Sequence, residues 1–200
     1  MEVFLSIFQI VLLEIYKFFV SECSNIRYLD LGEVRHPFPG AEICLLNLNE
    51  VDYYIEFKYD NIGLAKLIKT QKRIKYIKVE DITNEEREKD DIIKALEEYA
   101  NLIIYLNLSM QKTFSYLLFP KFVNLQTLKE CMYESEIIEK NLTAAIYPKL
   151  QILELEYMSI HIAIKIIQNT GGNLWEIKIR TIKITHSREY IQAIYKIVHT

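Results

Sequence analysis

The amino-acid sequence predicts a single α/β solenoid in which short parallel strands alternate with helices. Three observations lead to this class: a short apolar phrase recurs, the runs between its copies have helical periodicity, and half of the 200 residues are hydrophobic. The phrase, Leu-x-x-Leu/Ile-x-Leu/Ile, is clearest at residues 150–155 and 174–179. Between these two copies, four residues follow the i, i+3, i+4, i+7 spacing of one helical face: Ile160, Ala163, Ile164 and Ile167.

The repeat continues upstream at quasi-regular steps. The central residues of its six copies are Leu29, Ile77, Leu106, Leu128, Leu153 and Ile177, separated by 48, 29, 22, 25 and 24 residues. All steps but the first lie within the range of about 20–29 residues typical of leucine-rich repeats. The 48-residue step is close to the length of two repeats, which predicts an imperfect copy of the phrase near residues 43–59. In the copy at Leu128, Glu130 takes the third apolar position.

We therefore expect one leucine-rich-repeat domain over residues 1–200, with about six to seven irregular repeats. Its short parallel strands should line the concave face of a horseshoe and its helices the convex face. Because side chains alternate along a strand, the apolar residues of the phrase should point toward the core. In the last two clear copies, five residues are therefore expected to be buried: Leu153, Leu155, Leu174, Ile177 and Ile179.

The chain begins with its most apolar region, residues 1–20. Glu2 stands where a secretory signal would carry positive charge, and Glu14 and Lys17 would be costly inside a membrane. We expect residues 1–22 to form an N-terminal capping helix of the solenoid, which leads into the strand at Ile26. The alternative is a targeting segment, which would make this a secreted or membrane-tethered leucine-rich-repeat binding protein.

The other elements follow from local signals. Two prolines and a glycine predict a loop at residues 35–40. Helices are expected at residues 64–73, from residue 92 after the charged run 81–91, and at 135–145, 160–170 and 187–198. Gly171-Gly172 is expected to form the C-cap of the helix before it.

Composition and motifs exclude several classes of function. The formal net charge is −3, so no global basic field attracts nucleic acid. The three cysteines lack CxxC spacing and suit a reducing compartment, which predicts a cytoplasmic or nuclear protein. The four histidines are scattered, and no phosphate-binding, dinucleotide-binding or nucleophile-elbow motif occurs. We expect no catalytic residue, no cofactor and no metal.

The candidate site is the concave strand face, where the outward-facing residues of successive repeats should lie side by side. Tyr28, Tyr76 and Tyr105 occupy the same position of the phrase and are expected to form a column on the N-terminal half of this face. Tyrosine is enriched at binding hot spots. The alternative is that tyrosines simply suit strands. The predicted protein-binding residues are Tyr28, Tyr76, Lys78, Tyr105, Asn107, Lys129, Glu154, Glu176 and Lys178.

One stretch carries a family resemblance. The phrase Asn-Thr-Gly-Gly-Asn-Leu-Trp-Glu-Ile-Lys-Ile at residues 169–179, followed by Ile-Gln-Ala-Ile-Tyr at 191–195, resembles a fungal family of F-box/leucine-rich-repeat-like proteins. Further matches at residues 23–29, 39–41 and 66–73 extend the resemblance over about residues 14–198. It implies repeats that bind the substrate of a ubiquitin ligase, and an N-terminal F-box that recruits the Skp1-type adaptor of a cullin–RING ligase.

The N-terminus departs from that family. Residues 1–22 show no Leu-Pro-x-Glu opening and are too short for a three-helix F-box. The resemblance therefore covers the repeat region alone, and an adaptor is expected only if an F-box lies upstream. The sequence thus predicts a non-enzymatic protein–protein interaction module, the substrate-binding repeat region of an F-box-type receptor, with an unknown protein partner on the concave face.

Overall fold

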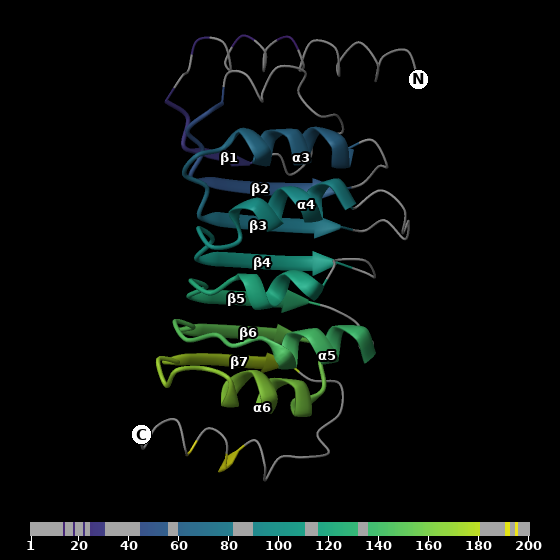
Figure 1. The fold of residues 1–200 in the computed structure, drawn as a ribbon, viewed down its shortest axis with the longest axis vertical. Helices are drawn as coiled ribbons and strands as arrows, with labels where there is room; N and C mark the ends of the chain where they lie inside the picture. Colours follow the sequence, from purple (N-terminus) through teal and green to yellow (C-terminus); the bar gives the residue numbers. More distant parts are fainter. Residues whose placement is uncertain are drawn as a thin grey trace.

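The computed structural model describes residues 14, 18, 22, 25–30, 45–55, 60–81, 90–110, 116–131, 136–180, 191, 192 and 195. Seven strands form one open, fully parallel sheet in which each strand lies beside its neighbour in the sequence (Figure 1). The strands are β1 (Tyr28–Asp30), β2 (Glu50–Ile55), β3 (Tyr76–Asp81), β4 (Tyr105–Met110), β5 (Thr127–Cys131), β6 (Ile152–Glu156) and β7 (Glu176–Arg180). The α/β class and the parallel strands are confirmed.

The strand register reproduces the predicted repeat. The central residues of the copies pair from strand to strand in the order Leu29, Val51, Ile77, Leu106, Leu128, Leu153 and Ile177. The long first step is divided by β2, whose central residue Val51 lies 22 residues after Leu29 and 26 before Ile77. The copy expected near residues 43–59 is therefore present.

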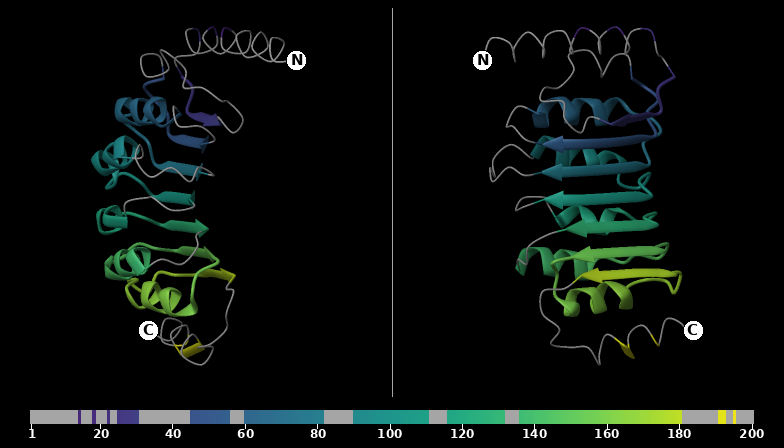
Figure 2. Two further views of the ribbon diagram at one scale, coloured as in Figure 1. Left: turned by 90° about the vertical axis from the view of Figure 1, so that its right-hand side faces the viewer. Right: turned by 180° about the vertical axis from the view of Figure 1, so that it is seen from behind.

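The connections between strands carry the helices, which all lie along one face of the sheet (Figure 2). They are α3 (Asp60–Thr70), α4 (Asp90–Tyr99), the 3₁₀ helix η1 (Tyr116–Lys121), α5 (Glu136–Ala144) and α6 (Ile160–Gln168). Parallel strands need such crossovers, because each strand starts again at the edge where its predecessor started. The inward strand residues and the helices enclose one continuous apolar core.

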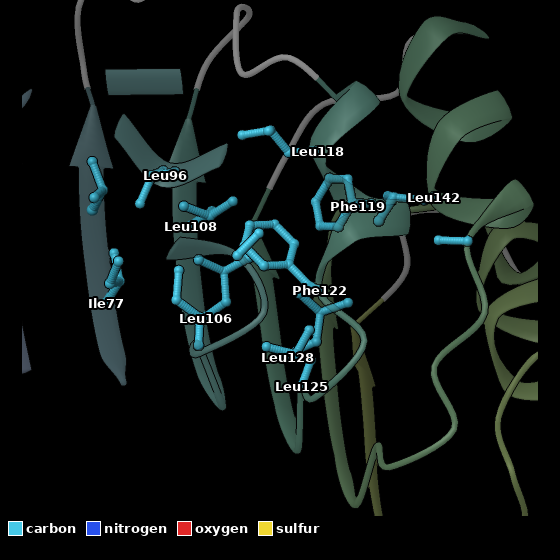
Figure 3. Packing of buried hydrophobic residues seen from close by; sticks show 14 of the residues in the cluster. Ile77, Leu96, Leu106, Leu108, Leu118, Phe119, Phe122, Leu125, Leu128 and Leu142 are labelled. Atoms are coloured by element: carbon cyan, nitrogen blue, oxygen red, sulfur yellow. The ribbon is translucent and has the colours of Figure 1, made fainter. Parts of the chain in front are cut away.

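The β4–β5 connection departs from the helical pattern. Its step is only 22 residues, and η1 contains Pro120, which cannot continue an α-helix. Phe119 and Phe122 of this connection are fully buried, with ring centroids 6.1 Å apart in an edge-on arrangement. They lie among the inward leucines of the neighbouring strands, so two aromatic rings fill the space that a helix occupies elsewhere (Figure 3).

The burial prediction holds for two of its five residues. Leu153 and Leu155 on β6 are 0% exposed, whereas Leu174, Ile177 and Ile179 are only partly buried. The expectation for those three was wrong, because among the described strands β7 pairs with β6 alone, as the last strand of the sheet.

Two helix ends differ from the prediction. The helix expected at 64–73 is α3, which both begins and ends earlier than expected, at Asp60 and Thr70. Directly after α3, the buried side chain of Gln71 forms hydrogen bonds with backbone groups. Its Oε1 accepts from the Leu48 amide at 2.8 Å, and its Nε2 donates to the Leu45 and Leu67 carbonyls. The C-cap of α6 is Asn169, not the glycine pair.

Several predictions fall partly or wholly outside the described residues: the loop at 35–40, most of the charged run 81–91, the capping helix 1–22 and the helix 187–198. Of the two terminal helices, residues 14, 18, 22, 191, 192 and 195 are described, and all six are helical. Among the described helices, none has the length and hydrophobicity to cross a membrane.

Candidate functional site: the open face of the sheet

The side of the sheet opposite the helices, here called the open face, is not covered by any described helix (Figure 2). Alternation along the strands places the residues on either side of each central residue on this face, as the burial pattern of β6 shows. All nine predicted binding residues occupy such positions on six of the seven strands. The register therefore gathers them on one surface.

A tyrosine pair lies near the middle of the open face. Tyr76 on β3 and Tyr105 on β4 are directly opposite in register, with ring centroids 6.0 Å apart and planes inclined by 38°. Tyr28 does not join them, because β2 places Glu50 between Tyr28 and Tyr76. The expected column of tyrosines, Tyr28, Tyr76 and Tyr105, is therefore wrong, and only Tyr76 and Tyr105 are neighbours. The reason is that β2 has Glu50 at the repeat position that holds tyrosine on β1, β3 and β4.

Ion pairs occupy the face on both sides of the tyrosines. Lys78 donates to Asp52 on the neighbouring strand at 2.9 Å and lies 3.1 Å from Glu80 on its own strand. The hydrogen bond to Asp52, more than any other interaction, raises the pKa of Lys78. On β5 and β6, Lys129 and Glu154 are 3.0 Å apart, and the hydrogen bond from Lys129 is the main cause of the lowered Glu154 pKa.

The C-terminal strands continue this pattern. Arg180 on β7 lies 2.6 Å from Glu156 on β6, and Lys178 lies 2.6 Å from Glu176 on the same strand. The hydrogen bond to Glu176 and its charge raise the pKa of Lys178. Over β4–β7 the three cations on the face are matched by three carboxylates.

Between these ion pairs lies an uncharged centre. Its residues come from four consecutive strands, β3 to β6: Tyr76, Tyr105, Asn107, Thr127 and Ile152. All except Thr127 are partly exposed. An aromatic and apolar centre with a charged rim is the arrangement found at protein-binding hot spots.

The strands β2 and β3 make the open face acidic at its N-terminal end. Among the described open-face residues of β2 and β3 there are three carboxylates, those of Glu50, Asp52 and Glu80, and one ammonium group, that of Lys78. Tyr28, whose hydroxyl donates to Asp30 at 3.4 Å, has a raised pKa because of desolvation and then because of the carboxylates of Asp30, Asp52 and Glu50. Glu50 and Asp52 were not predicted as site residues. The irregular copy of the phrase at β2 did not show which of its residues face outward until the strand register was known.

A second kind of candidate site would be a cluster of metal-ligating side chains. No group of three or more His, Cys, Asp or Glu residues that could hold a metal ion occurs among the described residues. His161 is the one histidine within them, and it lies exposed on α6. The chain matches no known protein-family profile, no curated protein and no solved structure.

Proposed function

We propose that this protein is a leucine-rich-repeat solenoid that acts as a non-enzymatic binding module and holds a basic, extended segment of a partner protein across its open face. The observation that carries the proposal is the Tyr76–Tyr105 pair, which lies partly exposed at the centre of a sheet face without a described helix over it. Tyrosine offers a large rigid contact area with a polar tip at low entropic cost.

The charges of the face indicate the chemistry of the partner. The cations of the face are already paired with its own carboxylates, so they offer little to an acidic partner. In contrast, the described open-face residues of β2 and β3 carry two carboxylates in excess, beside the tyrosine pair. A segment with arginine or lysine residues at one end complements this field, which speeds association and fixes the direction of binding. An arginine at its centre can stack on the tyrosine rings.

The dimensions favour a segment over a flat domain surface. Seven strands about 4.8 Å apart give a face roughly 29 Å long, and five residues at ~3.3 Å each give a width of about 16 Å. An extended chain of about eight or nine residues spans that length. A globular partner would need roughly 800 Å² from this protein, more than such a face provides.

The leucine-rich-repeat assignment rests on repeat steps of 22–29 residues, on strands that follow each other in chain order, and on helices along one face. Together with the resemblance to F-box/leucine-rich-repeat-like proteins, it makes the substrate-binding part of a ubiquitin-ligase receptor the cellular context that we propose. Binding of a Skp1-type adaptor by an N-terminally extended transcript product, but not by this chain, would support that context.

The binding site can be tested without knowing the partner. A phage library of random twelve-residue peptides is selected on the immobilised protein, and enriched peptides are measured by fluorescence anisotropy. We expect peptides with at least two arginine or lysine residues. Tyr76→Ala/Tyr105→Ala should weaken their binding at least about thirtyfold, which corresponds to ~2 kcal/mol.

The matched control is Trp175→Ala, which removes a large aromatic side chain that is 69% exposed just before β7, outside the uncharged centre. This variant should retain wild-type affinity. Enriched peptides that bind the folded tyrosine variant as tightly as the wild type would remove the open face as the site. Enrichment of acidic peptides would contradict the proposed partner chemistry.

A further inference from the structure

A polar cavity of about 690 Å³ lies where the chain enters the first strands, at the edge of the sheet from which the arrows start in Figure 1. Its described charged lining consists of Arg27, Lys72, Arg73 and Lys75, and none of the described lining residues is a carboxylate. The asparagines Asn25, Asn47 and Asn49 supply further amide donors. This volume is within the range of ligand sites, roughly 300–1,000 Å³.

The repeat itself builds this cavity. Asn25, Asn47 and Arg73 stand four residues before the central residues of β1, β2 and β3, and Arg27, Asn49 and Lys75 stand two residues before them. Because the strands are parallel and in register, equivalent positions from successive repeats meet at one edge. The carbonyls of Arg27, Asn49 and Lys75 each accept two amides from the next repeat, which fixes this edge.

The same position behaves differently in the C-terminal repeats. There Asn124 donates to the Asn101 carbonyl at 2.7 Å, Lys149 donates to Asn124 at 2.7 Å, and Asn173 donates to the Pro148 carbonyl at 2.8 Å. These bonds tie neighbouring turns together. Within the described part of the chain, the side chains of Asn25, Asn47 and Arg73 make no such bridge, so their donors remain available to the cavity.

The charge state of the cavity is also unlike that of the open face. On the open face Lys78, Lys129, Lys178 and Arg180 each have a carboxylate partner within 3.0 Å. Among the described residues, none of the four cations of the cavity is paired with an acidic side chain. Four uncompensated positive charges around one hollow attract a multivalent anion.

We propose that this cavity binds a small anion that carries two or more phosphate groups. Arg27 and Arg73 supply planar guanidinium groups that suit phosphate oxygens in pairs, and Lys72 and Lys75 supply point charges. The asparagine amides complete a donor set for several oxygens. A compact hollow suits a small molecule, whereas a nucleic acid requires a basic stripe that tracks its backbone.

The test uses tripolyphosphate as the ligand and measures binding by calorimetry and by the shift in melting temperature. The wild-type protein should bind it at 150 mM NaCl and melt at a higher temperature, because a ligand that binds only the folded state stabilises it. Arg73→Gln/Lys75→Gln should weaken binding at least tenfold. Both side chains are exposed, and the backbone bonds of Lys75 persist after the change.

The matched control is Lys66→Gln/Lys69→Gln, which removes the same charge from exposed positions of α3 that do not line the cavity. It should bind tripolyphosphate as the wild type does. No binding by the wild type, or equal weakening in both double variants, would overturn the proposal. If the cavity variant failed to fold, Asn47→Asp would replace it, because a carboxylate in the lining should also weaken binding at least tenfold.

Two further ligands define the chemistry. Citrate, with three carboxylates, should bind more weakly than tripolyphosphate; tighter citrate binding would overturn the assignment to phosphate. A twelve-nucleotide single-stranded DNA should bind more weakly than tripolyphosphate on a per-molecule basis. Tighter DNA binding that depends on Arg73 and Lys75 would replace the small anion with a nucleic acid and overturn the proposal.

Discussion

Glu130 occupies an apolar position in the middle of the core. On β5 it lies between Leu108 of β4 and Leu155 of β6 in the register, and it is 2% exposed. Neither carboxylate oxygen has a hydrogen-bond partner in the described part of the chain. Burial raises the Glu130 pKa well above its usual value of 4.5, and the pKa of Tyr147 is raised by its own burial and then by the Glu130 charge.

Glu130 destabilises the folded protein in either protonation state. The ionised carboxylate is costly to bury, and the protonated carboxyl still lacks a hydrogen-bond partner, which costs about 1–3 kcal/mol. Glu130→Leu restores the apolar residue of the repeat, and we expect it to stabilise the protein by roughly 1–4 kcal/mol at pH 7.

The gain should depend on pH in a defined direction. Since the folded-state pKa of Glu130 is raised, its protonation supports folding fully below the unfolded pKa near 4.5, and that support is lost as pH rises towards the folded pKa. Urea unfolding of wild type and Glu130→Leu at pH 5 and pH 7 measures this. The advantage of the leucine variant should be larger at pH 7 than at pH 5, because the raised Glu130 pKa makes the wild type lose stability as pH rises over this range.

Glu130→Gln is the matched control, because it keeps the shape and polarity but cannot ionise. Its stability difference from the wild type should show the same pH slope as that of the leucine variant, at a lower absolute stability, since the amide remains without a partner. A leucine variant that is less stable than the wild type at pH 7, or an advantage equal at both pH values, would contradict this account of a buried, unpartnered carboxyl with a raised pKa.

Three further changes test the packing of the repeat. Leu153→Ala should destabilise by about 2–5 kcal/mol in a thermal melt and Ile177→Ala by less, because only the first is fully buried; equal losses would contradict the strand order. Gln71→Ala should cost about 2–4 kcal/mol in urea unfolding, since it leaves buried backbone groups of the segment before β2 unpaired; no loss would show that water replaces the amide. Gly171→Ala should lower the melting temperature, because an added Cβ would lie 2.7 Å from the Pro148 carbonyl oxygen; an unchanged melt would mean that the turn shifts freely.

The sequence contained the strand order and most of the open face, because a phrase with period-two alternation specifies both spacing and direction of side chains. Leu153 and Lys129 were placed correctly for this reason. The irregular copy near residues 43–59 was expected, but its register was not, and hence the insertion of Glu50 between two tyrosines was missed. The cavity was also missed, since the prediction rested on the apolar and outward positions of the phrase alone; the signal was the recurrence of basic or amide residues four and two positions before the central residues of β1, β2 and β3.

The two proposed sites lie on neighbouring parts of the same repeats, yet they carry opposite charge. Arg27 and Asp30 are three residues apart, and Lys75 immediately precedes the strand that bears Glu80. Residues before a parallel strand collect at the sheet edge, whereas alternate residues within it collect on the open face. In this sequence the first set is basic at β1–β3, and the second has an excess of carboxylates at β2 and β3.

A basic segment drawn to the open face is therefore repelled from the edge, and a phosphate-bearing anion drawn to the edge is repelled from the open face. Two charge-selective surfaces follow from one repeat, and they can be tested separately. Arg73→Gln/Lys75→Gln should leave basic-peptide affinity unchanged or slightly raised, and Tyr76→Ala/Tyr105→Ala should leave tripolyphosphate binding unchanged. If either folded double variant lost both ligands, the two surfaces would be one site and this separation would be wrong.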